Sequence, residues 1–272
     1  MAEILIGTSG YYYQDWIGPF YPESIRKEKF LNYYSSIFPF CELNFSYYQM
    51  PRRGRLIGLM QQSPKTFQFS IKAHQSLTHE RGPNFTQQAE EFYHAVTPLA
   101  DEERLAGVLL QFPYSFHYNT NNRKYLAELV SIMEGLPLCV EFRNREWMME
   151  RVYTGFSERN ICFTQTDMPE LDNLPLPTST VTSEIGYIRF HGRNKENWWD
   201  GDNTSRFDYL YNEHELQSWL CRIEEIASKV KRLFIAFNNH HKGKAVQNAA
   251  QIYNLLRDHT GLEPEKVNFT AR

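Results

Sequence analysis

The sequence has few cysteines and no pair of them in a Cys-x-x-Cys arrangement. This absence argues against zinc-finger and thioredoxin-like sites. Three of the four cysteines lie in apolar, strand-like segments; the four are Cys41, Cys139, Cys162 and Cys221. We therefore expect buried, reduced thiols, which are typical of cytoplasmic proteins.

Long apolar runs and an excess of one charge are also absent. The apolar runs have the length of strands, and none is long enough for a membrane-spanning helix. The opening residues, MAEILIGTSG, lack the basic region and apolar stretch of a signal peptide. We thus expect a cytoplasmic protein with no membrane partner. Lys and Arg number 29 against 32 Asp and Glu, a net charge of −3, so no general attraction to nucleic acid is expected.

Short apolar runs alternate with helix-length segments along the 272 residues. The runs that predict strands are Ile4–Gly7, Cys41–Phe45, Phe67–Lys72, Gly107–Phe112, Leu138–Phe142, Ile161–Asp167, Gly186–His191 and Leu233–Asn238. The clearest helical segments are Ser24–Phe38, Gln87–Leu99, Arg123–Met133, Glu213–Val230 and Gly243–His259. This alternation predicts an α/β fold, a (β/α)8 TIM-like barrel, with an open doubly wound sheet as the alternative.

We expect a single domain over residues 1–272, with a core from about residue 4 to 259 and a peripheral tail. One connection is irregular. Residues 168–183 contain several prolines and no helical period, so strand six should reach strand seven through a loop. Residues 201–208 also read as an excursion from the regular pattern.

Several predicted strands alternate apolar and polar residues near their carboxyl ends. Because strand side chains alternate between faces, the polar face should point into the barrel, toward the mouth where active sites lie. This placement gathers a ring of polar side chains, namely Glu42, Asn44, Lys72, Gln111, Glu141, Arg143, Asp167, Arg189, His191 and Asn238. A closed ion-pair network could account for the charged ones, but so dense a cluster at a barrel mouth favours a site.

At these residues the sequence resembles the YecE-like family of domain-of-unknown-function proteins. The motifs that carry the resemblance are GTSGYYYQDWIGPFYP, ELNFSYYQMP, FQFSIKAHQSLTH, LLQFPYSF, VEFRNREW, IRFHGR and FNNHHKGKAVQNA. They run in order from about Ile4 to Ala250. The resemblance implies a TIM-barrel-like fold but no activity, so function has to be argued from the site.

Basic and glycine residues follow predicted strands seven and eight, where TIM barrels often bind phosphate. Arg189 and Arg193 end the seventh, and Asn238, Asn239 and a Gly-Lys segment end the eighth. The Gly7–Gly10 segment, which includes Ser9, could add backbone donors. An ordinary loop with solvated basic residues remains the alternative.

Acid–base chemistry is a second feature of the predicted mouth. Glu141 is the first candidate for an acid or base, with Asp167 or Glu42 as its counterpart. His191 could relay protons, and Lys72 could polarise a substrate or, if desolvated, form a Schiff base. Each could instead be an ion-pair partner only.

A divalent metal held by carboxylates with His191, His240 or His241 is less well supported, because no HExxH motif is present. No metal ligands and no cofactor are therefore assigned. Aromatic residues, including Trp16 and the Trp198–Trp199 pair, could stack on a substrate or simply close the barrel top.

The sequence therefore favours an enzyme of hydrolase or lyase type acting on a small polar, phosphate-bearing substrate. The expected catalytic residues are Glu141, Asp167, Glu42, His191 and Lys72. The expected substrate-binding residues are Arg143, Arg189, Arg193, Asn44, Gln111, Asn238, Asn239, Ser9 and Trp16. The alternatives are a non-catalytic protein that binds nucleic acid or a metabolite, and a scaffold whose charged mouth pairs internally. The oligomeric state is not indicated.

Overall fold

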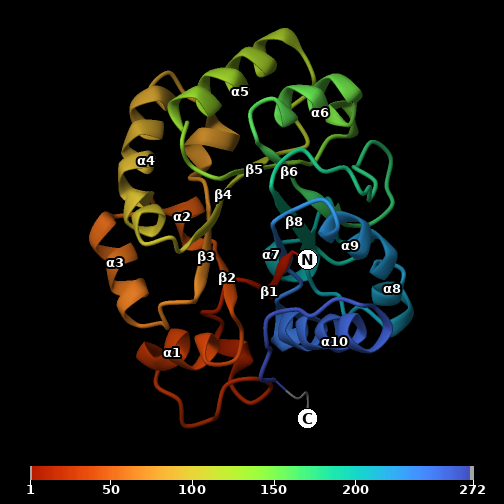
Figure 1. Ribbon diagram of the computed structural model, residues 1–272. Coiled ribbons are helices and arrows are strands. Elements are labelled where there is room, and N and C mark those ends of the chain that lie inside the picture. The colour runs from red at the N-terminus through yellow and green to blue at the C-terminus, as the bar shows by residue number, and fades with distance from the viewer. Residues whose placement is uncertain (1, 270–272) are drawn as a thin grey trace.

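Nine parallel strands form a nearly closed barrel in the computed structural model, which describes residues 2–269. The strands are β1 (Glu3–Ser9), β2 (Phe40–Leu43), β3 (Gln68–Lys72), β4 (Leu105–Phe112), β5 (Leu138–Phe142), β6 (Cys162–Phe163), β7 (Gln165–Asp167), β8 (Ile185–Phe190) and β9 (Arg232–Phe237). Their order in the sheet is β6-β5-β4-β3-β2-β1-β9-β8-β7. Figure 1 shows the strands in the middle of the molecule with helices around them. The predicted TIM-like barrel is confirmed.

The sheet has one seam, which falls within a single predicted strand. β6 pairs with β5 on one side of the seam, and β7 pairs with β8 on the other side. Only Thr164 separates β6 from β7, and its amide donates to the Val140 carbonyl. The predicted strand Ile161–Asp167 is thus broken in two, and its halves bridge the seam. The irregular link is also confirmed, since residues 168–184 contain no helix or strand.

Helices connect most of the strands. The α-helices are α1 (Phe30–Ser35), α2 (Phe45–Tyr48), α3 (Arg53–Gln61), α4 (Phe85–Asp101), α5 (Thr120–Ile132), α6 (Glu150–Ser157), α7 (Asn203–Arg206), α8 (Glu213–Gln217), α9 (Leu220–Ala227) and α10 (Lys244–His259). Short 3-10 turns lie at Gln14–Trp16, Lys27–Lys29, Arg145–Trp147 and His241–Gly243, and a π-helical turn at Ser76–Glu80.

Besides the divided strand at residues 161–167, three predicted elements differ from the structure. The strand expected to reach Phe45 ends at Leu43, because Phe45 begins helix α2. The helix predicted over residues 24–38 is shorter, since the chain passes through a 3-10 turn before α1. The helix predicted over residues 213–230 divides into α8 and α9. At the division, the Trp219 indole donates to the Asp167 carboxylate inside the protein.

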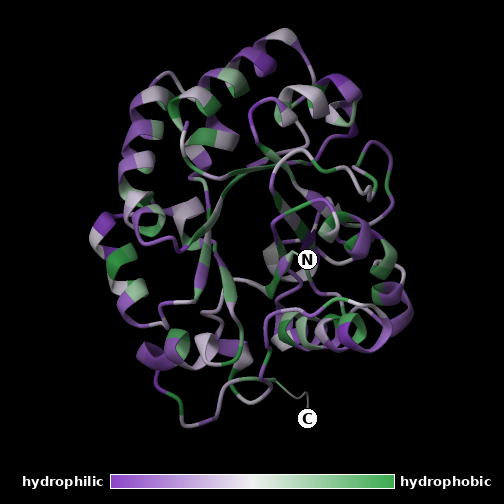
Figure 2. Cartoon of the chain, viewed as in Figure 1, coloured by the Kyte–Doolittle hydropathy of each residue, from purple (hydrophilic) through white to green (hydrophobic). Residues whose placement is uncertain are grey.

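Buried apolar side chains of the strands and the surrounding helices form the main core. Figure 2 shows hydrophobic positions in green on both strands and helices. A separate apolar cluster lies inside the barrel and includes Leu5, Phe40, Leu109, Cys139, Tyr187 and Phe234. The next inward-facing positions toward the carboxyl ends of β2, β5 and β8 are Glu42, Glu141 and Arg189. The barrel interior therefore changes from apolar to charged along its axis.

Close approach of β1 to β2 requires a glycine at residue 7. A Cβ atom at Gly7 would lie 2.0 Å from the Phe40 carbonyl oxygen, so no larger residue fits there. The C-terminal segment also contacts the barrel: the amide of Glu265 donates to Ile4, that of Asn268 donates to Ile37, and Val267 is buried. Within residues 2–269, no helix is both long and apolar enough to cross a membrane.

Candidate functional site

Three buried charged side chains meet inside the barrel from strands that are distant in the sheet. Arg189 on β8 donates from Nε and Nη2 to the two carboxylate oxygens of Glu42 on β2, at 2.8 and 2.6 Å. Its Nη1 donates to Glu141 Oε2 on β5, at 2.6 Å. All three side chains are almost completely buried. Because each guanidinium nitrogen has a carboxylate acceptor, the desolvation cost of these charges is largely offset.

Arg143 and His191 extend this network. Arg143 Nε donates to Glu141 Oε1 at 2.6 Å, and His191 Nε2 lies 3.2 Å from the same oxygen. The Tyr187 hydroxyl donates to Glu42 at 2.9 Å. We call Glu42, Glu141, Arg143, Arg189 and His191 the buried network. Its two carboxylates are balanced by its two guanidinium groups.

The arginines fix the protonation states in the buried network. Burial alone would raise the pKa of Glu141, but Arg189 and Arg143 outweigh burial and hold that pKa well below its ordinary value. Burial and then the Arg143 charge lower the pKa of His191 to about 3. Glu141 is therefore charged and His191 neutral at neutral pH.

Asp167 belongs to a separate group of residues. Its carboxylate accepts hydrogen bonds from Arg193 Nε and Nη2 at 2.9 and 2.6 Å. The Tyr211 hydroxyl and the Trp219 indole donate to it at 2.7 and 2.6 Å. Four donors occupy this buried carboxylate, so the geometry favours a role in joining β7 to the loops and turn that carry Arg193, Tyr211 and Trp219.

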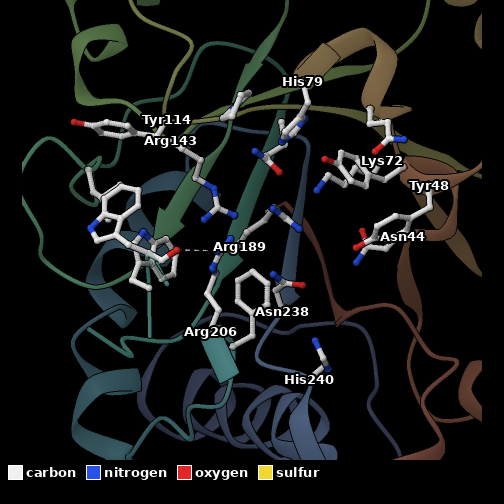
Figure 3. Close-up of a pocket in the computed structure, with 18 of the residues that line it drawn as sticks. Asn44, Tyr48, Lys72, His79, Tyr114, Arg143, Arg189, Arg206, Asn238 and His240 are labelled. Carbon is white, nitrogen blue, oxygen red and sulfur yellow. Dashed lines mark hydrogen bonds between the residues drawn. The ribbon is translucent and has the colours of Figure 1, made fainter. Parts of the chain in front are cut away.

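A pocket of about 670 Å3 opens at the carboxyl ends of the strands, above the buried network. Figure 3 shows the side chains that line it. The lining residues are Tyr13, Asn44, Tyr47, Tyr48, Lys72, Gln75, His79, Gln111, Pro113, Tyr114, Arg143, Leu174, Arg189, Trp198, Trp199, Arg206, Phe207, Asn238 and His240. Its volume lies in the range of sites for small molecules, about 300–1,000 Å3.

The pocket carries charge of one sign. Four of the lining residues are Lys72, Arg143, Arg189 and Arg206, and none of those described is Asp or Glu. In Figure 3, Arg143 and Arg206 lie on one side, and Lys72 and Asn44 lie opposite. The carboxylates of the buried network lie outside the lining, so the pocket presents positive charge.

Two polar atoms of the lining have no hydrogen-bond partner in the structure although they are buried. They are Arg206 Nε, a donor, and Asn44 Oδ1, an acceptor. Unsatisfied buried polar groups cost stability and need an explanation at a native site. Both residues line the pocket, but these two atoms themselves are covered by neighbouring atoms.

Aromatic side chains lie around the cationic residues of the pocket. Trp198 stacks above Arg143, with the guanidinium carbon 5.4 Å from the ring centroid. Tyr114 and Trp199 meet edge to face with centroids 5.0 Å apart. Tyr48 and Trp199 are among the most exposed large hydrophobic residues, at 62% and 48%. These flat faces suit contact with a sugar or a planar ring.

The expected site residues fall into three groups. Six line the pocket: Asn44, Lys72, Gln111, Arg143, Arg189 and Asn238. Three lie in the buried network outside the lining: Glu42, Glu141 and His191. The other five are elsewhere: Asp167 pairs with Arg193, while Ser9, Trp16 and Asn239 are buried outside the lining.

Trp16 and Asn239 form hydrogen bonds within the protein, and Ser9 is buried. The Trp16 indole donates to the His240 carbonyl at 2.7 Å, which holds the first loop against the last. Asn239 donates to Tyr209 and to Asn248. Ser9 Oγ is buried without a partner. None of these observations tests the substrate-binding role, which stays a prediction.

The basic loop after β9 is largely paired with carboxylates. Lys244 pairs with Asp208, and the Lys242 amide donates to Asp15 at 2.6 Å. The cationic side chains that face the pocket come instead from β3, from the residue directly after β5, from β8 and from helix α7.

Sequence reasoning missed several lining residues, namely Gln75, His79, Tyr114, Leu174, Arg206 and Phe207. Arg206 and Phe207 lie in the excursion at residues 201–208, whose irregularity was the only signal. The others follow strand ends by a few residues, where the alternation of strand side chains no longer applies. In the part of the chain that is described, no three His, Cys, Asp or Glu side chains are placed to hold a metal ion.

Fold and site together define a TIM-barrel-like protein with a cationic pocket at the carboxyl-terminal mouth. The chain belongs to the family described as protein of unknown function DUF72, whose model matches residues 5–268. The motif resemblance to a barrel family of unknown function is thus confirmed at this level. The finer YecE-like name stays a prediction.

Similar proteins cover nearly the whole chain. The UPF0759 protein YunF of Bacillus subtilis is 32% identical over 286 residues, which span 97% of this chain and 99% of that protein. The crystal structure of a DUF72 family protein from Thermotoga maritima has a TM-score of 0.86 and 34% identity. It covers 94% of this chain and 100% of its own. A DUF72 family structure from Enterococcus faecalis has a TM-score of 0.84 at 24% identity, with 98% of each chain covered, and shows the shared fold.

Proposed function

We propose that the protein binds a small, phosphate-bearing compound in the mouth pocket and acts on it by acid–base chemistry, as a hydrolase or lyase. The observation that carries the proposal is a pocket lined by four cationic side chains with no carboxylate among the described lining residues. Guanidinium groups bind phosphate oxygens through charge-assisted, paired hydrogen bonds.

The scaffold alternative predicts that the charges of the mouth pair internally. That holds for the buried network, whose carboxylates are saturated by Arg143 and Arg189. It does not extend to the pocket, where Arg206 keeps a buried, unpartnered Nε and Lys72 Nζ has no carboxylate within 4.0 Å among the described residues. An open pocket with uncompensated positive charge supports a ligand site.

Catalysis, as opposed to binding alone, is supported by the protonation chemistry available in the pocket. Burial and the charges of Arg189 and Arg143 lower the pKa of Lys72 to about 7. A general acid or base works best when its pKa is near the ambient pH. Glu42 and Glu141 do not line the pocket, so the geometry favours a positioning role for them, holding Arg143 and Arg189 in place.

The test is calorimetric and thermal-shift titration of the protein with inorganic phosphate, ribose 5-phosphate and a nucleoside monophosphate. A ligand at a hundred times its Kd adds about 2.7 kcal/mol of stability, which raises the Tm by roughly 5–11 °C at this size. The Arg206→Gln variant should bind about 10–150-fold more weakly, because a charged hydrogen bond contributes about 1.5–3 kcal/mol. Arg26→Gln, at an exposed arginine, is the matched control. No shift with any phosphate compound contradicts the proposal.

A non-catalytic nucleic-acid site is the second candidate, because exposed Tyr48 and Trp199 on the pocket rim could stack on unpaired bases. It predicts binding of short single strands that weakens steeply with salt. Absence of binding at low salt contradicts this candidate.

A further inference from the structure

Lys72 differs from the paired lysines of the protein in its surroundings. Lys229, Lys231 and Lys244 each form an ion pair with a carboxylate, but among the described residues none lies within 4.0 Å of Lys72 Nζ. The Lys72 amine instead lies 4.3 Å from the centroid of the Tyr47 ring. It stands at the end of β3, is half-buried and lines the pocket.

The buried network explains why this amine lacks a counter-ion. Glu42 and Glu141 are already neutralised by Arg189 and Arg143, which bind them at 2.6–2.8 Å. A third cation beside them has no unpaired carboxylate to bind. The other charged or titratable groups that face Lys72 are His79 and Tyr47. Neither is a carboxylate.

We infer that Lys72 is a nucleophilic amine that forms an imine with a carbonyl group of the phosphate-bearing substrate. The inference rests on the proposed function, because the guanidinium groups of Arg143 and Arg206 across the pocket would hold the phosphate (Figure 3). Substrate phosphate and carbonyl would then lie against opposite walls. The substrate class is a phosphorylated aldehyde or ketone.

The step needs no oxidant or reductant. The Nζ lone pair attacks the carbonyl carbon, the C–N bond forms, and the C=O electron pair moves to oxygen, which takes up the proton that the nitrogen gives up. A second proton converts the hydroxyl group of this carbinolamine to water, which leaves as the C–O bond breaks. The sum is amine plus carbonyl plus one proton giving an iminium ion and water. The iminium nitrogen can accept electrons from an adjacent C–C or C–H bond, which is the chemistry of a lyase.

The lowered pKa of Lys72 supports this role. An amine with a pKa of about 7 is about half neutral at pH 7, whereas an ordinary lysine is neutral in roughly one molecule in three thousand. Only the neutral form carries the lone pair. At pH 7 we therefore expect Lys72 to react roughly a hundredfold or more faster than an exposed lysine.

The experiment labels the wild-type protein at pH 7 with an aldehyde and cyanoborohydride, followed by peptide mapping. One arm uses formaldehyde, which tests the amine alone, and the other uses pyridoxal 5′-phosphate, which carries both an aldehyde and a phosphate. Lys65, an exposed lysine, is the internal control. We expect Lys72 to be labelled first in both arms, and inorganic phosphate to slow its labelling by pyridoxal 5′-phosphate without affecting Lys65.

The outcomes separate the inference from the proposed function. Labelling of Lys72 no faster than that of Lys65 in both arms overturns the imine, even if phosphate still raises the Tm. Fast labelling by formaldehyde, together with labelling by pyridoxal 5′-phosphate that inorganic phosphate does not slow, overturns the anion site and with it the substrate class. Lys72→Arg keeps the charge but cannot form the imine, so it should lose the label and keep the phosphate-induced shift in Tm. Lys72→Met gives a second check on the labelled position.

Discussion

Replacing Glu141 by Gln tests the buried network most severely. Glu141 is fully buried and joins two cations, Arg143 through Oε1 and Arg189 through Oε2, each at 2.6 Å. Glutamine has nearly the same shape, but its amide is neutral and turns a donor toward one of the guanidinium groups. Arg143 and Arg189 would then share only Glu42 as a buried counter-charge.

The expected loss of stability follows because the substitution removes the negative partner of a buried ion pair and leaves the arginines in place. Such changes cost about 3–5 kcal/mol because a charge is left uncompensated. For a chain of this length each kcal/mol corresponds to roughly 2–4 °C, so the Tm should fall by about 6–20 °C. Glu90→Gln, on the exposed surface of helix α4, should change stability by less than about 0.5 kcal/mol.

Urea unfolding followed by circular dichroism at pH 7 measures both variants against wild type. The difference in stability between wild type and Glu141→Gln should also change with pH in a definite direction. Because the folded pKa of Glu141 lies well below 4.5, its contribution is complete above that pH and is lost as the pH falls further. The difference between wild type and Glu141→Gln should therefore shrink below pH 4.5. A loss under about 1 kcal/mol at pH 7 would refute the network as a source of stability.

Three further predictions concern single residues. His191 stays neutral in the folded protein, with a pKa of about 3, so below pH 6.5 the unfolded chain binds more protons than the folded one. The contribution of this residue to the stability therefore falls as the pH falls from 6.5. Urea unfolding between pH 7 and 5 should show a smaller fall in stability for His191→Asn than for wild type. Trp219→Phe removes one of four donors to buried Asp167 and should cost about 1–3 kcal/mol in urea unfolding, whereas an unchanged midpoint would contradict this role. With Ellman's reagent, only exposed Cys221 should react in the native state and all four thiols after unfolding; two or more fast native thiols would contradict the burial of Cys41, Cys139 and Cys162.

The barrel could be predicted because its signal is local and repeated. Runs such as Leu138–Phe142 match observed strands, and the prolines of residues 168–183 marked the irregular link. Alternation in the strands also identified the inward-facing residues, since Glu42, Glu141 and Arg189 do meet in the interior. The alternation does not show how far along the barrel axis, and so how near the mouth, each side chain lies.

Depth decides which charged residue faces a ligand. Glu141 lies in β5 and Arg143 directly follows that strand, two residues further on, yet only Arg143 of the two lines the pocket. Contacts between distant parts of the chain decide the rest. Asp167 is held by Trp219 and Tyr211, far along the chain, and no pattern within strand six indicates this. Arg206 enters the pocket from α7, a helical turn of four residues that is too short to show a helix period in the sequence.

The proposed function depends on one claim, that the mouth pocket holds the phosphate group of a ligand. A crystal structure of the protein with ribose 5-phosphate, at the concentration that saturates it in solution, tests this most directly. We predict phosphate oxygens at about 2.7–2.9 Å from guanidinium nitrogens of Arg143 or Arg206, with the sugar extending toward Lys72. A pocket without ligand density under those conditions, or a phosphate bound only elsewhere on the molecule, would contradict the claim.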